Sequence, residues 1–224
     1  MALAEELKSP LMRIARQSEL LASTGCMPEG LSNVRMNADM TLQLLDSYLL
    51  SLHLIREPDA LFAVQPVSIG AVLHEARGRL VDVAREYDVE LELAIGGRYE
   101  PVMANNQALT AALVSLGYSL IEALPAMGTQ QLRLQLAAHR TKHGIVAGMY
   151  CDAESLTPES LRRARNLHGH TRQPFVDALP GSGAGVFVAE AILKAMSSRL
   201  RVGRHQRLPG FAVTLSPSQQ LQLV

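Results

Sequence analysis

The chain has few aromatic residues and only two cysteines. The first shortage limits which residues can build its core, and the second argues against a disulfide-rich fold. It contains no Trp, and aromatic residues make up 4% of its 224 positions. A core must therefore be built from Leu, Val, Ala, Ile and Met. Cys26 and Cys151 are far apart and lie in unrelated contexts. Two isolated cysteines argue against a disulfide scaffold and predict reduced thiols in a cytoplasmic protein.

Net charge and long apolar runs are absent as well. The 21 basic and 21 acidic residues give a formal net charge of +0, so no basic patch argues for nucleic-acid binding. We see no apolar run long enough to span a bilayer and no signal peptide, and we expect no membrane segment in this chain. The length suits one ordinary domain, or a small dimerisation element followed by a domain.

A glycine-rich stretch stands out near the C-terminus. Residues 180–186 read PGSGAGV, with Gly181, Gly183 and Gly185 in front of an apolar run. Glycines cost backbone entropy, so a local reason is needed for three of them. One reason is a loop that leads into a helix N-terminus, whose unpaired N–H groups attract phosphate. A tight loop before a packed helix explains the spacing equally well.

The first part of the chain predicts two amphipathic helices. Apolar residues recur at spacings of three and four over residues 3–23, where Pro10 should kink the helix, and again over residues 31–54. Glycine and proline between them predict a break. A hairpin of two such helices cannot bury its apolar stripe alone. It either pairs with a second copy in a four-helix bundle or packs on the rest of its own chain.

Helices and strands are mixed in the remainder of the chain. We expect a helix at residues 69–87 capped by Ser68, a long helix opened by Asn105, a helix beginning at Pro158 and a last helix in the apolar run that follows Gly185. Residues 62–67 read as an extended connector. Strands are predicted at residues 89–93, 101–104, 132–136, 145–150, 200–203 and 211–215. This mixture predicts an antiparallel-rich sheet with helices on one face.

The two ends of the chain together resemble the two-component sensor histidine kinases. Residues 181–186, GSGAGV, resemble the family's G-x-G-L-G-L motif, and residues 5–11, EELKSPL, resemble its phosphoacceptor box H-E-L-R/K-T/S-P-L. The resemblance covers essentially the whole chain. It implies an α+β protein with a helical-hairpin dimerisation domain at residues 1–60, forming a dimeric four-helix bundle. A histidine-kinase-type ATPase domain, an α/β sandwich, would follow at residues 61–224.

The phosphoacceptor position departs from the family pattern. Glu5 stands where the family has its nucleophilic His, and a carboxylate cannot form the phosphoramidate that imidazole forms. His53 and His74 do not lie at the family's position, and we interpret both as ordinary histidines. Glu6 and Ser9 fall where members that dephosphorylate a partner carry an acidic residue and a Thr or Asn. A solvated helix face explains these two residues as well.

The helix that would help to hold magnesium also departs from the family pattern. Residues 105–120 resemble the family's D-P-x-x-L-x-x-V-L-x-N-L-L-x-N-A helix, in which Asn helps to hold magnesium. Ser115 and Ser119 occupy the two Asn positions, and their spacing keeps them on one helix face. A serine hydroxyl is a poorer oxygen donor at this reach than an amide carbonyl. The resemblance therefore implies that binding of ATP with Mg²⁺ is weakened or lost.

The adenine loop is the third departure. Residues 151–159, CDAESLTPE, look like D-x-G-x-G-I-P-x-E without either glycine. Asp152 matches the family's adenine-reading Asp when one residue is deleted, and Cys151 stands there without the gap.

His168 and His170 form a His-x-His pair with no third ligand in view, so we predict no metal site. The resemblance leaves six candidate nucleotide-binding residues: Ser115, Ser119, Asp152, Gly181, Gly183 and Gly185.

The scaffold pattern survives while residues that carry the chemistry are replaced at three separate places. We interpret the chain as a histidine-kinase-like signalling protein that has lost autokinase activity. It would act as a homodimer whose hairpin binds a response regulator or another signalling protein. The alternative is an ATP-binding kinase, which would need an acceptor such as His53 or His74, or a phosphatase for a partner. A relay protein that accepts phosphate from another kinase would also need the missing His.

Overall fold

The computed structural model describes three stretches of the chain and a few isolated residues. The stretches are residues 63–127, 132–165 and 184–218, and the isolated residues are Arg13, Ile14, Gln17, Val34 and Thr41. These five residues are helical. The rest of the predicted hairpin at residues 1–60 lies outside the described residues, and so do Gly181 and Gly183.

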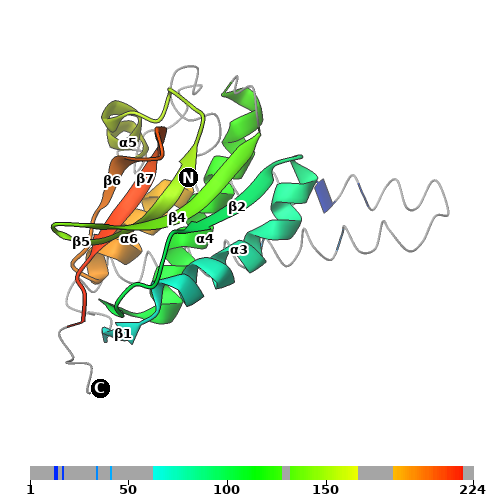
Figure 1. Cartoon of the computed structure of the whole chain (residues 1–224). Helices are drawn as coiled ribbons and strands as arrows, with labels where there is room; N and C mark the ends of the chain where they lie inside the picture. Colours follow the sequence, from blue (N-terminus) through cyan, green and yellow to red (C-terminus); the bar gives the residue numbers. More distant parts are fainter. Residues whose placement is uncertain are drawn as a thin grey trace.

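A five-stranded sheet forms the centre of the described fold (Figure 1). The strand order is β2-β4-β5-β7-β6, with β2 parallel to β4 and every other neighbouring pair antiparallel. The predicted antiparallel-rich sheet is therefore confirmed. Its strands are β2 (Glu90–Ile95), β4 (Arg133–Thr141), β5 (Gly144–Cys151), β6 (Leu200–His205) and β7 (Leu208–Leu215).

Three helices cover one face of this sheet (Figure 1). They are α3 (Ile69–Glu86), α4 (Asn106–Ala123) and α6 (Ala184–Ala195), while the shorter α5 (Pro158–Arg165) packs on α6. Alternate strand residues such as Leu136 and Met149 are fully buried beneath the helices. The helix α4 lies between α3 and α6 and is buried on nearly every side, which explains its apolar sequence. Among the described helices, none has the length and apolar character needed to cross a bilayer.

Local sequence signals explain where the helices begin. The N–H of Ala71 donates to Ser68 Oγ at 3.4 Å, and the N–H of Ala108 donates to Asn105 Oδ1 at 3.0 Å. Each side chain satisfies one of the N–H groups that a helix start leaves unpaired. The predicted starts of α3, α4 and α5 are confirmed.

A second, two-stranded sheet was not foreseen. The strand β1 (Gln65–Val67) pairs antiparallel with β3 (Val102–Ala104), where the sequence indicated only an extended connector at residues 62–67. Three residues that include Pro66 are too short to show a strand period. Proline is tolerated here because a two-stranded sheet has only edge strands.

Candidate functional site

The helices α4 and α6 meet where three of the candidate nucleotide-binding residues lie. The N–H of Gly185 donates to the Ser119 hydroxyl at 3.0 Å, and this hydrogen bond is buried. Ser115, one turn earlier on α4, is also buried. The predicted face shared by the two serines therefore exists, and it packs against the start of α6.

Gly185 allows this contact because it has no side chain. A methyl group at Gly185 would overlap the carbonyl oxygen of Ser115 and the hydroxyl of Ser119. The sequence left two explanations for the glycine-rich stretch, a phosphate-binding loop and a tight loop before a packed helix. Close packing of two helices accounts for the glycine at position 185.

The Ser119–Gly185 bond changes what the start of α6 can bind. The first N–H groups of a helix have no partner within the helix, and they attract anions for that reason. Ser119 already satisfies the N–H of Gly185. A phosphate here would have to break this bond or rely on the neighbouring N–H groups. The same bond holds the Ser119 oxygen against α6, and Ser119 as a residue is 8% exposed.

Asp152, the candidate for binding the adenine amino group, lies directly after strand β5. Its side chain is exposed. The loop that follows is closed by two backbone hydrogen bonds, from Ala153 N–H to the Cys151 carbonyl at 2.9 Å and from Leu156 N–H to the Ala153 carbonyl at 3.1 Å. Ala153 and Leu156 are buried, so the core holds this loop in place.

The spacing to helix α5 favours Asp152 over Cys151 as the counterpart of the adenine-reading Asp. Helix α5 begins at Pro158, six positions after Asp152, and the motif D-x-G-x-G-I-P has the same Asp-to-Pro spacing. Up to Pro158 this register needs no deletion, whereas the final Glu of the motif then falls on Ser160, one position after Glu159. On this register Glu154 and Leu156 stand at the two glycine positions, and the Leu156 side chain is packed into the core.

Cys151 has a different environment from its neighbour. It ends strand β5 with its side chain fully buried. Burial, assisted by the nearby Asp152 carboxylate, raises the pKa of the Cys151 thiol to about 12. The thiol is therefore neutral at pH 7 and belongs to the apolar core rather than to a polar site.

Several residues singled out from the sequence cannot be placed. Glu5, Glu6 and Ser9 lie outside the described residues, as do Gly181, Gly183, His53, His168 and His170. His74 is exposed on α3, as expected for an ordinary surface histidine. Within the described stretches, no group of three or more His, Cys, Asp or Glu side chains is placed to hold a metal ion.

A contact that sequence reasoning missed joins the first predicted helix to α3. Arg13 Nη1 lies 3.3 Å from Glu86 Oε1, and its guanidinium lies 5.2 Å from the centre of the Tyr87 ring. Burial raises the pKa of the neighbouring Tyr118 and Glu122 side chains. No local pattern signals this cluster, because 73 residues separate Arg13 from Glu86.

Comparison with solved structures decides which fold this is, although neither a protein-family model nor a curated protein sequence matches the chain. The histidine kinase AdeS of Acinetobacter baumannii aligns over 95% of this chain and 98% of its own, with a TM-score of 0.57 and 14% identity. The catalytic domain of histidine kinase ThkA aligns over 70% of this chain and 97% of its own, with a TM-score of 0.53 and 9% identity. The chain has a histidine kinase fold.

A third similar structure contains a nucleotide analogue. Full-length ShkA in complex with AMPPNP aligns with a TM-score of 0.57 and 17% identity, over 96% of this chain and 46% of that protein. The chain therefore spans about half the length of ShkA. At such identities the likeness establishes the histidine-kinase-like fold, while the chemistry of the site depends on the residues present in this chain.

Proposed function

We propose that this chain is a histidine-kinase-like signal-transduction protein without autokinase activity. Residues 1–60 form a dimeric helical hairpin that binds a response regulator or another signalling protein, and residues 61–224 serve as a scaffold or a second partner surface. The hydrogen bond between Ser119 and Gly185 carries this proposal. The side chain at the magnesium-Asn position is engaged in joining two helices.

Two further replacements support the same function. Glu5 at the acceptor position lacks the imidazole that would receive a phosphoryl group. Leu156, which we align with a glycine position of the adenine motif, carries a bulky side chain that is buried in the core. Together with Ser119 at the metal position, these two replacements impair three separate requirements of autophosphorylation, which are the acceptor, the metal and the adenine loop. One reversion would not restore all three.

An ATP-binding kinase or a phosphatase for a partner is the second candidate. The complex of the similarly folded ShkA with AMPPNP favours nucleotide binding by this fold. In this chain Asp152 is exposed at the end of β5, where a carboxylate can accept a hydrogen bond from an adenine amino group. Glu6 and Ser9, at the positions of phosphatase residues in the family, favour the phosphatase form of this candidate.

Calorimetric titration with ATP, with and without Mg²⁺, tests the first candidate against the second. We expect no binding heat and no thermal stabilisation of the full chain at millimolar ATP, because the metal and adenine positions are altered. Micromolar, Mg²⁺-dependent binding would contradict the proposal. In that event Asp152→Ala should abolish binding, and Ser155→Ala, which removes an exposed hydroxyl from the same loop, serves as the matched control.

The partner half of the proposal has its own test. Light scattering of the full chain should give the mass of a dimer, and receiver domains of response regulators should bind it without any transfer of phosphate. Charge-reversing substitution of Glu6, on the predicted first helix, should weaken receiver binding and leave the dimer intact. A monomer, or a dimer that binds no receiver domain, would contradict this part.

A further inference from the structure

The sheet has a second face, opposite to the one that α3, α4 and α6 cover, and we call it the outer face. Ala137, Tyr150 and Ala212 are buried there, and Leu208 packs on them. His205 ends β6 and Leu208 begins β7, so residues 205–208 form the tip of the β6–β7 hairpin. The hairpin tip therefore lies against the outer face.

Two glycines allow the hairpin to reach across the sheet. The strand β6 is at the edge, and β7 and β5 separate it from β4. A side chain at Gly210 of β7 would overlap the Met149 carbonyl oxygen and the Tyr150 ring. A side chain at Gly148 of β5 would overlap Ala212. Glycine within a strand marks a sharp bend or a close approach of two backbones, and here it lets the hairpin tip reach β4.

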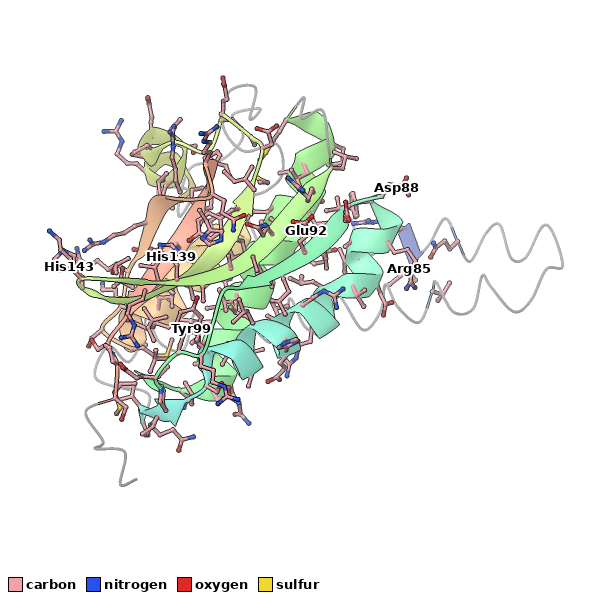
Figure 2. The ribbon with its side chains drawn as sticks, viewed as in Figure 1. Arg85, Asp88, Glu92, Tyr99, His139 and His143 are labelled. Carbon is pink, nitrogen blue, oxygen red and sulfur yellow. The ribbon has the colours of Figure 1, made fainter. Side chains whose placement is uncertain are left out.

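A pair of histidines fastens the hairpin tip to β4. His139 Nδ1 lies 3.3 Å from His205 Nδ1, and the stacked rings have centres 5.2 Å apart. This contact is a hydrogen bond when one ring donates its Nδ1–H and the other ring accepts with the lone pair of its Nδ1. Figure 2 labels His139 on β4.

The histidine pair tolerates only two protons on its four ring nitrogens. His205 Nε2 is buried and has no hydrogen-bond partner in the described part of the chain. His205 is therefore the better donor through Nδ1, because its Nε2 then carries no proton that needs an acceptor. A third proton would go to His205 Nε2, where its N–H is buried without an acceptor, or to His139 Nδ1, where it faces the N–H of His205. Either position destabilises the closed pair.

The turn at the hairpin tip does not hold itself in place. Gln206 and Arg207 have positive φ angles of 47° and 74°. A two-residue hairpin turn of this kind normally contains asparagine or glycine, which adopt positive φ most readily. Glutamine and arginine adopt it at a cost in free energy. The flanking contacts of His205 and Leu208 must therefore offset this strain.

We propose that His139 and His205 form a pH-sensitive latch, which holds the hairpin tip on the outer face at neutral pH and releases it in mild acid. Burial lowers the pKa of both imidazoles, and His139 further lowers the pKa of His205. Because the folded pKa values lie below the ordinary 6.5, the stabilisation is complete above pH 6.5 and is lost as the pH falls below it, toward the folded values.

The groups around the latch do not favour a charged imidazole. On β5, burial raises the pKa of Tyr150 to about 12, so the phenol stays neutral in this range. On β2, the Glu92 carboxylate already accepts hydrogen bonds from Arg133 and Gln135 of β4. At the end of β4, Arg140 is paired with Glu100.

The hairpin and the turn between β4 and β5 contribute exposed basic side chains and no carboxylate, and these are Lys142, His143, Arg201, Arg204 and Arg207. Like charges disfavour a further positive charge on the imidazoles. The latch lies on the opposite face from the Ser119–Gly185 contact. It therefore goes beyond the proposed function and does not depend on nucleotide binding.

Hydrogen–deuterium exchange of the full chain, followed by mass spectrometry, tests the latch through peptides that cover residues 200–210. Exchange is corrected for the intrinsic effect of pH on free amides. The corrected exchange of these peptides should be about tenfold faster at pH 5.5 than at pH 7.5, because the tip opens in acid. Peptides from the buried helix α4 should not change in this way.

Three variants make the test specific. His139→Ala should give fast exchange of the hairpin tip at both pH values, because the latch is absent. His143→Ala is the matched control, since His143 is exposed at the turn between β4 and β5 (Figure 2) and should keep the wild-type pH dependence. Arg207→Gly relieves strain in the turn and should move the opening to a lower pH.

Equal corrected exchange of the wild-type hairpin tip at the two pH values would overturn the proposal. A pH dependence that survives His139→Ala would overturn it as well. Thermal unfolding at neutral pH checks that each variant is folded. If His139→Ala does not fold, NMR titration of the wild-type imidazoles still decides the matter. A pKa at or above the ordinary 6.5 for both His139 and His205 would contradict the latch.

Discussion

The N–H of Gly185 donates to the hydroxyl of Ser119 across 3.0 Å, and this bond ties the start of α6 to α4. Ser119, for which the sequence resemblance predicted a place near magnesium, takes part in a helix–helix contact in the structure. Such a contact stabilises the fold whether or not a nucleotide is bound. Its contribution to the free energy of unfolding can be measured directly.

Replacing Ser119 with Ala should destabilise the protein by about 1–2 kcal/mol, because the buried N–H of Gly185 loses its acceptor. Urea unfolding followed by circular dichroism measures this loss. Ser155→Ala, which removes an exposed hydroxyl from the β5–α5 loop, is the control and should change the free energy of unfolding by less than about 0.5 kcal/mol. Equal effects of the two substitutions would show that Ser119 does not cap α6.

Two glycine-to-alanine substitutions should have opposite effects. Gly185→Ala should cost about 1–3 kcal/mol, because the new methyl overlaps the Ser115 carbonyl and forces α6 away from α4. Gly78→Ala should raise stability by about 0.5–1 kcal/mol, because a methyl at this position of α3 meets no atom within 4 Å and alanine favours the helix. Thermal unfolding of both variants checks the contrast. A tolerated methyl at position 185 would contradict the close packing of α4 and α6.

Cys151 should resist alkylation in the folded protein. Its thiol is fully buried, and burial with the Asp152 carboxylate raises its pKa to about 12 from an ordinary 9.0. In a Cys26→Ser background we expect iodoacetamide at pH 8 to modify Cys151 only as fast as the protein unfolds. Mass spectrometry over time, with a urea-unfolded sample as the control, measures the rate. Rapid modification of the folded chain would show that the thiol is accessible.

The same thiol should make stability fall at alkaline pH. Because the folded pKa of Cys151 exceeds the unfolded one, its contribution is complete below pH 9.0 and declines as the pH rises toward about 12. Between pH 9 and pH 10 the loss should be about 1 kcal/mol. Urea unfolding across this range should show a shallower decline in Cys151→Ala than in the parent. Parallel declines would contradict the raised pKa.

The Arg13–Glu86 pair should show a measurable coupling energy. Both side chains are 23% exposed and 3.3 Å apart, so a double-mutant cycle with Arg13→Ala and Glu86→Ala should give about 0.5–1 kcal/mol. The pair Arg85–Asp82 on α3 is the control. Its side chains are 77% and 59% exposed, and its coupling should be close to zero. Zero coupling for both pairs would mean that Arg13 does not dock on α3 in solution.

Much of the fold was predictable because its signals are local. Alternation of Leu134 and Leu136 with polar neighbours identified β4, and Ser68, Asn105 and Pro158 marked the starts of three helices. These signals act over a few residues, where the periods of strands and helices are fixed by backbone geometry. The strand β1 escaped prediction because three residues, one of them Pro66, carry too little of that pattern.

The candidate site was predictable only in part. The sequence indicated that Ser115 and Ser119 share a helix face and that Gly185 precedes a packed helix. It did not indicate that Ser119 and Gly185 bond to each other, or that Leu156 is buried at a glycine position of the adenine motif. A glycine that serves a loop and a glycine that serves a helix contact look alike until the neighbouring element is known.

The sequence by itself determined most of the element types, the mixed α+β class and the resemblance to histidine kinases, and from that resemblance came the prediction that Glu5 stands at the acceptor position. Tertiary structure alone decided which distant residues meet. The Ser119–Gly185 bond and the His139–His205 pair each join residues 66 positions apart. Secondary structure follows from interactions between near neighbours in the chain, whereas such pairs arise from the packing of whole helices and strands, which no local pattern encodes.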